Sequence, residues 1–144
     1  MKAQQVIGRH GEDIARNALH QAGVEMVEKI GTPVLLSPVL SNKPNVFHVA
    51  WGEKVSGDHR GLLYGGQSVL AETKTILDRN LRYSDLREHQ PERLRIHAEF
   101  GGLSLLVWVH STGVYVMKFP IAGFVPGTSL APHQAEALNV ESLI

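Results

Sequence analysis

The chain has 144 residues, of which 43% are hydrophobic and 19% are charged, and its 14 Lys and Arg residues balance 14 Asp and Glu residues. This length and composition are typical of a single domain, here residues 1–144, with its own hydrophobic core. The chain contains no cysteine, which excludes disulfides and thiolate metal sites within it. Because no apolar run is long enough to cross a bilayer and the N-terminus lacks the apolar stretch of a signal peptide, we expect a cytoplasmic protein without a membrane partner.

Helical spacing of small and apolar residues predicts an amphipathic helix over residues 9–22, with Gly23 as its end. Glu12 is expected in the first turn of this helix, where the helix dipole favours an acid. A turn is expected at residues 41–45. Short β-type runs are predicted at residues 24–30, 34–40, 46–51, 54–64 and 68–75.

The last two of these runs flank Gly65-Gly66 and are typical of a β-hairpin. In the second strand, alternation places Glu72 and Lys74 on one face. An even loop would turn Asp58 away from that face. An odd loop, such as residues 65–67, or a β-bulge would bring Asp58 to it.

Residues 76–84 are predicted to be irregular, and residues 85–100 are predicted to form a second helix, with Pro91 near its first turn. A tail rich in Gly and Pro begins at Pro120 and becomes weakly helical. Two strongly apolar strands are predicted before it, at residues 103–109 and 114–119. This order of elements indicates an α/β fold with a central mixed β-sheet flanked by helices.

The most informative pattern is Asp58 followed, fourteen residues later, by the triplet Glu72-Thr73-Lys74. Carboxylate oxygens bind hard divalent cations such as Mg²⁺. Such cations polarise a phosphate and generate hydroxide from bound water, and a lysine beside them positions that water or counters the developing charge. The pattern predicts metal-dependent phosphodiester cleavage, with charged residues on the exposed face of a hairpin as the alternative.

Other catalytic signatures are weaker in this sequence. The eight histidines show neither the H-x(3)-H nor the H-E-x-x-H spacing of a zinc hydrolase. A G-x-S-x-G elbow of a serine hydrolase is absent. Gly65-Gly66 is not followed by the lysine and helix of a phosphate-binding loop.

Four segments resemble motifs of the PD-(D/E)xK nuclease superfamily and, within it, of the RecU-type and archaeal-type Holliday junction resolvases. They are Gly8–Glu12, Gly57–Gly61, Glu72–Lys74 and His89-Gln90, the last followed by Gly101-Gly102 and an apolar strand. The resemblance spans residues 8–119 and implies a restriction-endonuclease-like core. Two departures are Gly57, where the superfamily name has proline, and His59-Arg60, where RecU-type proteins tend to carry an aromatic residue.

The resemblance implies a structure-selective endodeoxyribonuclease that resolves four-way DNA junctions with paired symmetric nicks. Symmetric cutting of branched DNA implies a two-fold homodimer. Lys74 would position the attacking water, and Gln90 would orient Lys74 or that water. The ligands of Mg²⁺, with Mn²⁺ as an alternative, would be Asp58, Glu72, the backbone carbonyl of Thr73 and Glu12.

Arginines are the expected phosphate contacts, and they should make DNA binding depend steeply on salt. Arg79 and Arg82 rank first because they follow the site in an irregular segment. The full set is Arg9, Arg16, Arg60, Arg79, Arg82 and Arg87. Three alternatives remain open at this point. They are another nuclease of the superfamily (flap, end-processing or restriction-like), a catalytically inactive DNA-binding module of the same fold, and an α/β domain whose motif match is accidental.

Overall fold

The computed structural model describes residues 3–29, 33–37, 48–51 and 59–143. The predicted turn at 41–45 and Asp58 lie outside this part of the chain. The elements in chain order are α1 (Ala3–Ala22), β1 (Glu25–Lys29), β2 (Pro33–Ser37), β3 (His48–Trp51), β4 (His59–Leu62), β5 (Ser68–Thr75), β6 (Leu81–Arg82), the 3₁₀-helix η2 (Tyr83–Asp85), α2 (Gln90–Glu99), β7 (Leu103–His110), β8 (Gly113–Lys118), β9 (Ser129–Leu130) and α3 (Pro132–Leu138).

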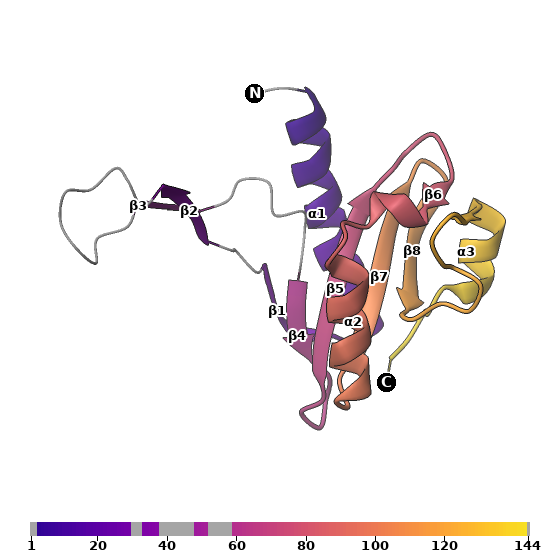
Figure 1. Cartoon of the computed structure of the whole chain (residues 1–144). Coiled ribbons are helices and arrows are strands. Elements are labelled where there is room, and N and C mark those ends of the chain that lie inside the picture. The colour runs from indigo at the N-terminus through magenta and orange to yellow at the C-terminus, as the bar shows by residue number, and fades with distance from the viewer. Residues whose placement is uncertain (1–2, 30–32, 38–47, 52–58, 144) are drawn as a thin grey trace.

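The main sheet has five strands in the order β1-β4-β5-β7-β8. β5 and β7 are parallel and are connected through α2, whereas the other neighbouring pairs are antiparallel. Two small two-stranded sheets, β2-β3 and β6-β9, accompany it. In Figure 1, α1 and α2 lie on opposite sides of the main sheet. This arrangement confirms the predicted α/β fold with a mixed sheet between helices.

Alternation along β7 divides the core into two clusters, because successive side chains of a strand point to opposite faces. Leu105 and Val107 pack with Leu19 of α1. Leu106 and Trp108 belong to the cluster on the other face, which includes residues of α2, β8 and α3. β5 takes part in the same division, so its odd-numbered residues Val69 and Ala71 lie on the α1 face.

The first helix is longer than predicted. α1 begins at Ala3, so Glu12 lies in the middle of the helix, and its expected position in the first turn is wrong. The Ala-Gln-Gln stretch at the start of α1 favours helix, and the helix extends through Gly8. The predicted end is confirmed: Gly23 has a φ of 111°, and its N–H donates to the carbonyl of His20.

The second helix is shorter than predicted. α2 begins at Gln90 rather than at residue 85, and a 3₁₀ turn and a loop precede it. Asp85 accepts hydrogen bonds from Arg79 and from the N–H of Arg82, and these bonds hold it in the loop. Pro91 stands in the first turn of α2, as expected, because the N–H groups there have no partner within the helix. Gly101, with a φ of 96°, ends the helix as predicted.

The segment predicted to be irregular contains a short strand. Leu81 pairs with Leu130 and Arg82 pairs with Ser129, which joins β6 to β9. Strands of two residues are too short to produce a detectable alternation. The strands β7 and β8 agree with the sequence expectation to within one residue at each end. None of the helices in the described ranges is long and apolar enough to cross a membrane.

Candidate catalytic site on strand β5

The β4–β5 hairpin has the loop parity that the catalytic interpretation requires. The N–H of Leu63 donates to the carbonyl of Gln67 at 3.0 Å, which leaves three residues, Tyr64-Gly65-Gly66, in the loop. The loop is therefore the odd alternative of the two that the sequence left open, and it begins one residue earlier than the 65–67 considered for it. Asp58 precedes the first residue of β4 and lies outside the described residues.

Glu72 and Lys74 form a buried pair on β5. The Lys74 Nζ lies 3.5 Å from Glu72 Oε1, and the two residues are only 8% and 2% exposed, respectively. β5 is the middle strand of the sheet, and residues of α2 pack beside Glu72 on this face. Burial removes water from both charges, and attraction between them offsets only part of that cost. The pair therefore calls for a reason other than stability.

Gln90 holds the carboxylate of this pair. Its Nε2 donates to Glu72 Oε1 at 2.9 Å, while its Oε1 accepts the N–H of Arg87 at 2.8 Å. Both the nitrogen and the oxygen of the Gln90 side-chain amide are therefore held by hydrogen bonds. Gln90 was expected to orient Lys74 or water, whereas this hydrogen bond orients Glu72. Leu70 and Arg93 line the small space beside the contact.

Thr73 presents its side chain to the opposite face from Glu72, because the two residues are adjacent on a strand. The side chain is buried, and its Oγ1 has no hydrogen-bond partner among the described atoms. On the side of Glu72, Thr73 can therefore offer a metal only its backbone carbonyl, which is the group that was predicted as a ligand.

Glu12 lies on α1, the helix that covers the face opposite to Glu72. Its Oε2 accepts a hydrogen bond from Lys29 Nζ of β1 at 2.7 Å. This contact links the helix to the edge of the sheet. Within the described ranges, no three His, Asp or Glu side chains converge on a possible metal position. The metal-binding role of Glu12 stays a prediction, as does that of Asp58.

Arg79, a preferred candidate for phosphate contact, is engaged within the fold. Its two terminal nitrogens donate to the Asp85 carboxylate at 2.8 and 2.7 Å. This hydrogen-bonded pair raises the pKa of Arg79 and lowers the pKa of Asp85. The geometry gives Arg79 a structural task in the loop before α2. The other candidates with described side chains, Arg16, Arg60, Arg82 and Arg87, are exposed.

Two basic residues beside the predicted site residues, Arg93 and Lys29, were not predicted from the sequence. Arg93 lines the space beside Glu72 and follows Gln90 by three residues, so both stand on neighbouring positions of one helix face. That spacing is the sequence pattern that could have identified Arg93. No pattern in the sequence identifies Lys29 as the partner of Glu12, because their pairing depends on how α1 lies against β1.

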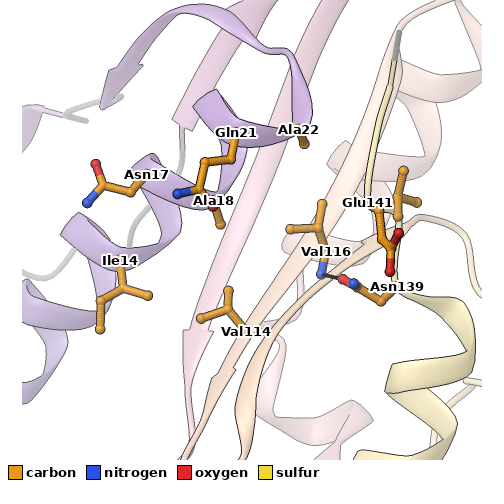
Figure 2. Close-up of a pocket in the computed structure, with 10 residues that line it drawn as sticks. Ile14, Asn17, Ala18, Gln21, Ala22, Val114, Val116, Asn139 and Glu141 are labelled. Atoms are coloured by element: carbon orange, nitrogen blue, oxygen red, sulfur yellow. Dashed lines mark hydrogen bonds between the residues drawn. The ribbon is translucent and has the colours of Figure 1, made fainter.

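An open cavity of about 410 Å³ lies between α1, β8 and the C-terminal segment. Figure 2 shows Ile14, Val114 and Val116 lining it, with Asn139 Oδ1 accepting the N–H of Val116. The hydrogen bond measures 2.8 Å and secures the tail along the edge of the sheet. The cavity lies on the α1 side and contains none of the residues predicted to be catalytic, so the candidate site remains that on β5.

Comparison of the sequence with models of known protein families gives no match, and comparison with curated proteins gives none either. A functional assignment therefore depends on the geometry around Glu72 and on the four short motifs described above.

Proposed function

We propose that this protein is a metal-dependent endodeoxyribonuclease that resolves four-way DNA junctions by phosphodiester hydrolysis. The observation that carries the proposal is the buried Glu72–Lys74 pair, held by Gln90 beneath α2. A buried ion pair contributes little net stability, because desolvation offsets its attraction. Charged groups in such surroundings are concentrated at catalytic sites.

The donor groups fit a hard divalent cation. Carboxylate and carbonyl oxygens are the ligands that Mg²⁺ accepts, and the proposed set is Asp58, Glu72 and the carbonyl of Thr73, with Glu12 directly or through water. When bound, Mg²⁺ or Mn²⁺ supplies Lewis acidity and lowers the pKa of a coordinated water. The proposal requires Asp58 to point to the face on which Glu72 lies. The odd loop of the hairpin is compatible with that requirement.

The remaining groups position the reactants. Lys74 offers an ammonium group that holds the attacking water and offsets the negative charge that develops on the phosphate. Gln90 fixes the Glu72 carboxylate through one hydrogen bond, which keeps a ligand oriented before metal binds. Because both charged residues are nearly excluded from water, their electrostatic effect on a bound phosphate is stronger than at an exposed surface.

The choice of a four-way junction as the substrate rests on the resemblance to resolvases. Paired symmetric cuts require two active sites related by a two-fold axis, so the proposal includes a homodimer. Exposed arginines, among them Arg60 and Arg82, supply phosphate contacts that position the DNA. Their contribution makes affinity fall as salt rises.

The test is cleavage of an end-labelled synthetic four-way junction with Mg²⁺, Mn²⁺ or EDTA, beside duplex, flap and single-stranded DNA. The wild type should introduce paired symmetric nicks into the junction, in a metal-dependent reaction. Asp58→Asn should lose cleavage and keep DNA binding, because a repelling carboxylate is removed. Asp78→Asn is the matched control, since Asp78 is exposed and has no role in the proposed site.

Each result has a distinct meaning. Cleavage of flaps or duplex in place of junctions keeps the catalytic residues and replaces the substrate. DNA binding without metal-dependent cleavage favours an inactive binding module. Normal cleavage by Asp58→Asn contradicts the assignment of this aspartate as a metal ligand.

A further inference from the structure

Two aromatic side chains stand almost fully in solvent at one end of the molecule. Tyr64 is 93% exposed and Phe100 is 87% exposed, the highest values among the exposed large hydrophobic residues described. Tyr64 belongs to the β4–β5 loop and Phe100 caps the C-terminus of α2. Gln67 Nε2 donates to the carbonyl of Gly101 at 3.2 Å and ties the two loops together. Figure 1 shows the hairpin tip beside this end of α2.

Glycines flank both aromatic residues in the chain. Gly65, Gly66 and Gly101 all have positive φ, and a Cβ atom added to any of them would meet no other atom within 4 Å. The rings therefore project from loops that are open to solvent. Leu62 and Ile96, which precede Tyr64 and Phe100 in the chain, are 38% and 41% exposed. The flat faces of the two rings are suited to stacking with a planar ligand such as a base.

A strip of side chains connects the rings with the candidate site. Arg60 pairs opposite Leu70 and Leu62 pairs opposite Ser68, so all four point to the same face as Glu72. Glu72 lies four positions after Ser68 along β5, which corresponds to about 13 Å.

The helix α2 lines the other side of this strip. Arg93, Ile96 and Phe100 follow one another at intervals of three and four residues, which places them along one side of the helix. Arg93 lines the space beside Leu70 and Glu72. The same side of α2 that borders the site therefore leads to Phe100.

Charges along this strip favour a polyanion. Arg60 is exposed on the sheet face that carries Glu72, and Arg93 is exposed on α2, which borders the strip. Glu28 pairs opposite Arg60 and Glu25 pairs opposite Leu62, so two acids of β1 mark its outer side. A DNA strand would be attracted to the arginines and repelled by Glu25 and Glu28, which favours a path between β4 and α2.

We propose that Tyr64 and Phe100 form a stacking platform for an unstacked base of the DNA substrate, at the hairpin end of the strip and beyond Ser68 as seen from Glu72. Branched DNA presents such bases where its arms meet, and aromatic side chains bind any base through its flat face. The phosphates of the same strand pass over Arg60 and Arg93 toward Lys74. This inference rests on the proposed nuclease function and adds how the enzyme recognises distorted DNA.

The test uses a four-way junction with 2-aminopurine at the branch point, in EDTA to prevent cleavage, and a blunt duplex for comparison. Fluorescence reports stacking of the base, and anisotropy of a labelled arm reports affinity. Tyr64→Ala and Phe100→Ala should each weaken junction binding by about 5- to 100-fold and leave duplex binding and the salt slope unchanged. Tyr64→Phe should retain wild-type affinity, since it keeps the ring.

Val125→Ala is the control, because Val125 is 51% exposed and lies outside the strip. If the wild type cuts junctions while both alanine variants keep wild-type affinity and fluorescence, the platform is wrong and the nuclease assignment stands. If the wild type neither binds nor cuts any DNA, both proposals are overturned. If the alanine variants instead convert a dimer to a monomer in sedimentation and leave base stacking unchanged, the rings serve self-association and the platform is wrong.

Discussion

At the scale of single residues, the molecule's least expected feature is a lysine and a glutamate buried side by side on a central strand. Glu72 and Lys74 are separated by one residue, so they share a face of β5, and Gln90 at the start of α2 contacts Glu72. Isolated burial of either charge would be costly. Their mutual contact and the hydrogen bond from Gln90 reduce this cost. The arrangement links local strand geometry to a preorganised polar site.

A double-mutant cycle can measure how much the Glu72–Lys74 pair contributes to the stability of the protein. Glu72→Gln or Lys74→Met alone should lower the free energy of unfolding by about 3–5 kcal/mol, because each leaves a buried charge without its partner. The double variant should lose much less than the sum of the two. Urea denaturation measures all four proteins. Additive losses would show that the two side chains do not compensate each other in the folded protein.

A half-buried polar group is His97, which connects β5, α2 and β7. Ser104 Oγ donates to the carbonyl of Leu94 at 2.6 Å, so it accepts from His97 Nδ1, 3.0 Å away. The His97 Nε2 is then the acceptor for the Ser68 hydroxyl at 3.1 Å. The ring packs against Gly102, where a Cβ atom would come within 2.2 Å of it. This packing limits its hydration, and burial lowers the pKa of His97.

We predict that His97 makes stability depend on pH below 6.5, its ordinary pKa. In that range the unfolded chain binds more protons than the folded protein, so the free energy of unfolding falls as pH falls. Above pH 6.5 this contribution is complete. Urea midpoints between pH 5 and 8 should show a smaller acid-side decrease in His97→Gln than in the wild type. Equal decreases in the two proteins would contradict the prediction.

The sequence was enough to predict that Glu72 and Lys74 lie together, but it did not predict all the residues that contact the candidate site residues. An acid and a lysine in an otherwise apolar strand stand out in the sequence, and the alternation of β5 predicts their shared face. The partners of Glu12 and Gln90 were harder to predict, because they depend on where two helices lie on the sheet. The pairing of Arg79 with Asp85 was not predicted, since it arises from a loop conformation that no short pattern encodes.

At the scale of elements, the contact between α1 and β5 depends on a helical glycine. Gly11 is buried, and a Cβ atom there would lie only 2.0 Å from Oγ1 of Thr75. The helix approaches the strand closely because Gly11 has no side chain. This explains why a residue that weakens helices occupies the middle of α1.

Gly11→Ala should therefore destabilise the protein by about 1–3 kcal/mol through overpacking, despite the better helix propensity of alanine. Combining it with Thr75→Ala, which removes the obstructing hydroxyl, should recover part of the loss. Thermal unfolding of the two single variants and the double variant measures both effects. A Gly11→Ala protein as stable as the wild type would show that α1 does not lie so close to β5.

Elements with a clear repeating pattern were predictable, and short or context-dependent ones were not. The apolar strands β7 and β8 and the glycine-ended helices carry strong local signals. The sequence left an even and an odd β4–β5 loop open, and the hydrogen bond between Leu63 and Gln67 shows that the loop is odd. β6 and β9 are stabilised by pairing with each other, and the early start of α1 reflects a helix propensity that Gly8 concealed.

At the scale of the whole molecule, the two faces of the sheet have different compositions. The α1 face is an apolar cluster, whereas the α2 face combines apolar packing with the polar site on β5. The chain carries no net charge, so affinity for DNA must come from how arginines are distributed. Arg60 lies on the face of the site, and Arg79 is paired with Asp85.

These two arginines should affect DNA binding differently. Arg60→Gln should reduce the slope of log affinity against log salt by about 0.9, the value expected for one lost phosphate contact on duplex DNA. Arg79→Gln should leave that slope unchanged and lower stability, because it breaks the bond to Asp85. Titrations at several salt concentrations, with unfolding curves for both variants, distinguish the roles. An unchanged slope in Arg60→Gln would remove it from the DNA contacts.

The most direct test of the central claim is the single-turnover rate at which Glu72→Gln cuts a four-way junction with saturating Mg²⁺. The variant retains the size of the side chain and loses only its charge. If Glu72 belongs to the catalytic site, the rate should fall by at least two orders of magnitude, on the order of the loss caused by removing one electrostatic catalytic group, while the folded protein still binds the junction. Cleavage at the wild-type rate by a folded Glu72→Gln variant would contradict the account.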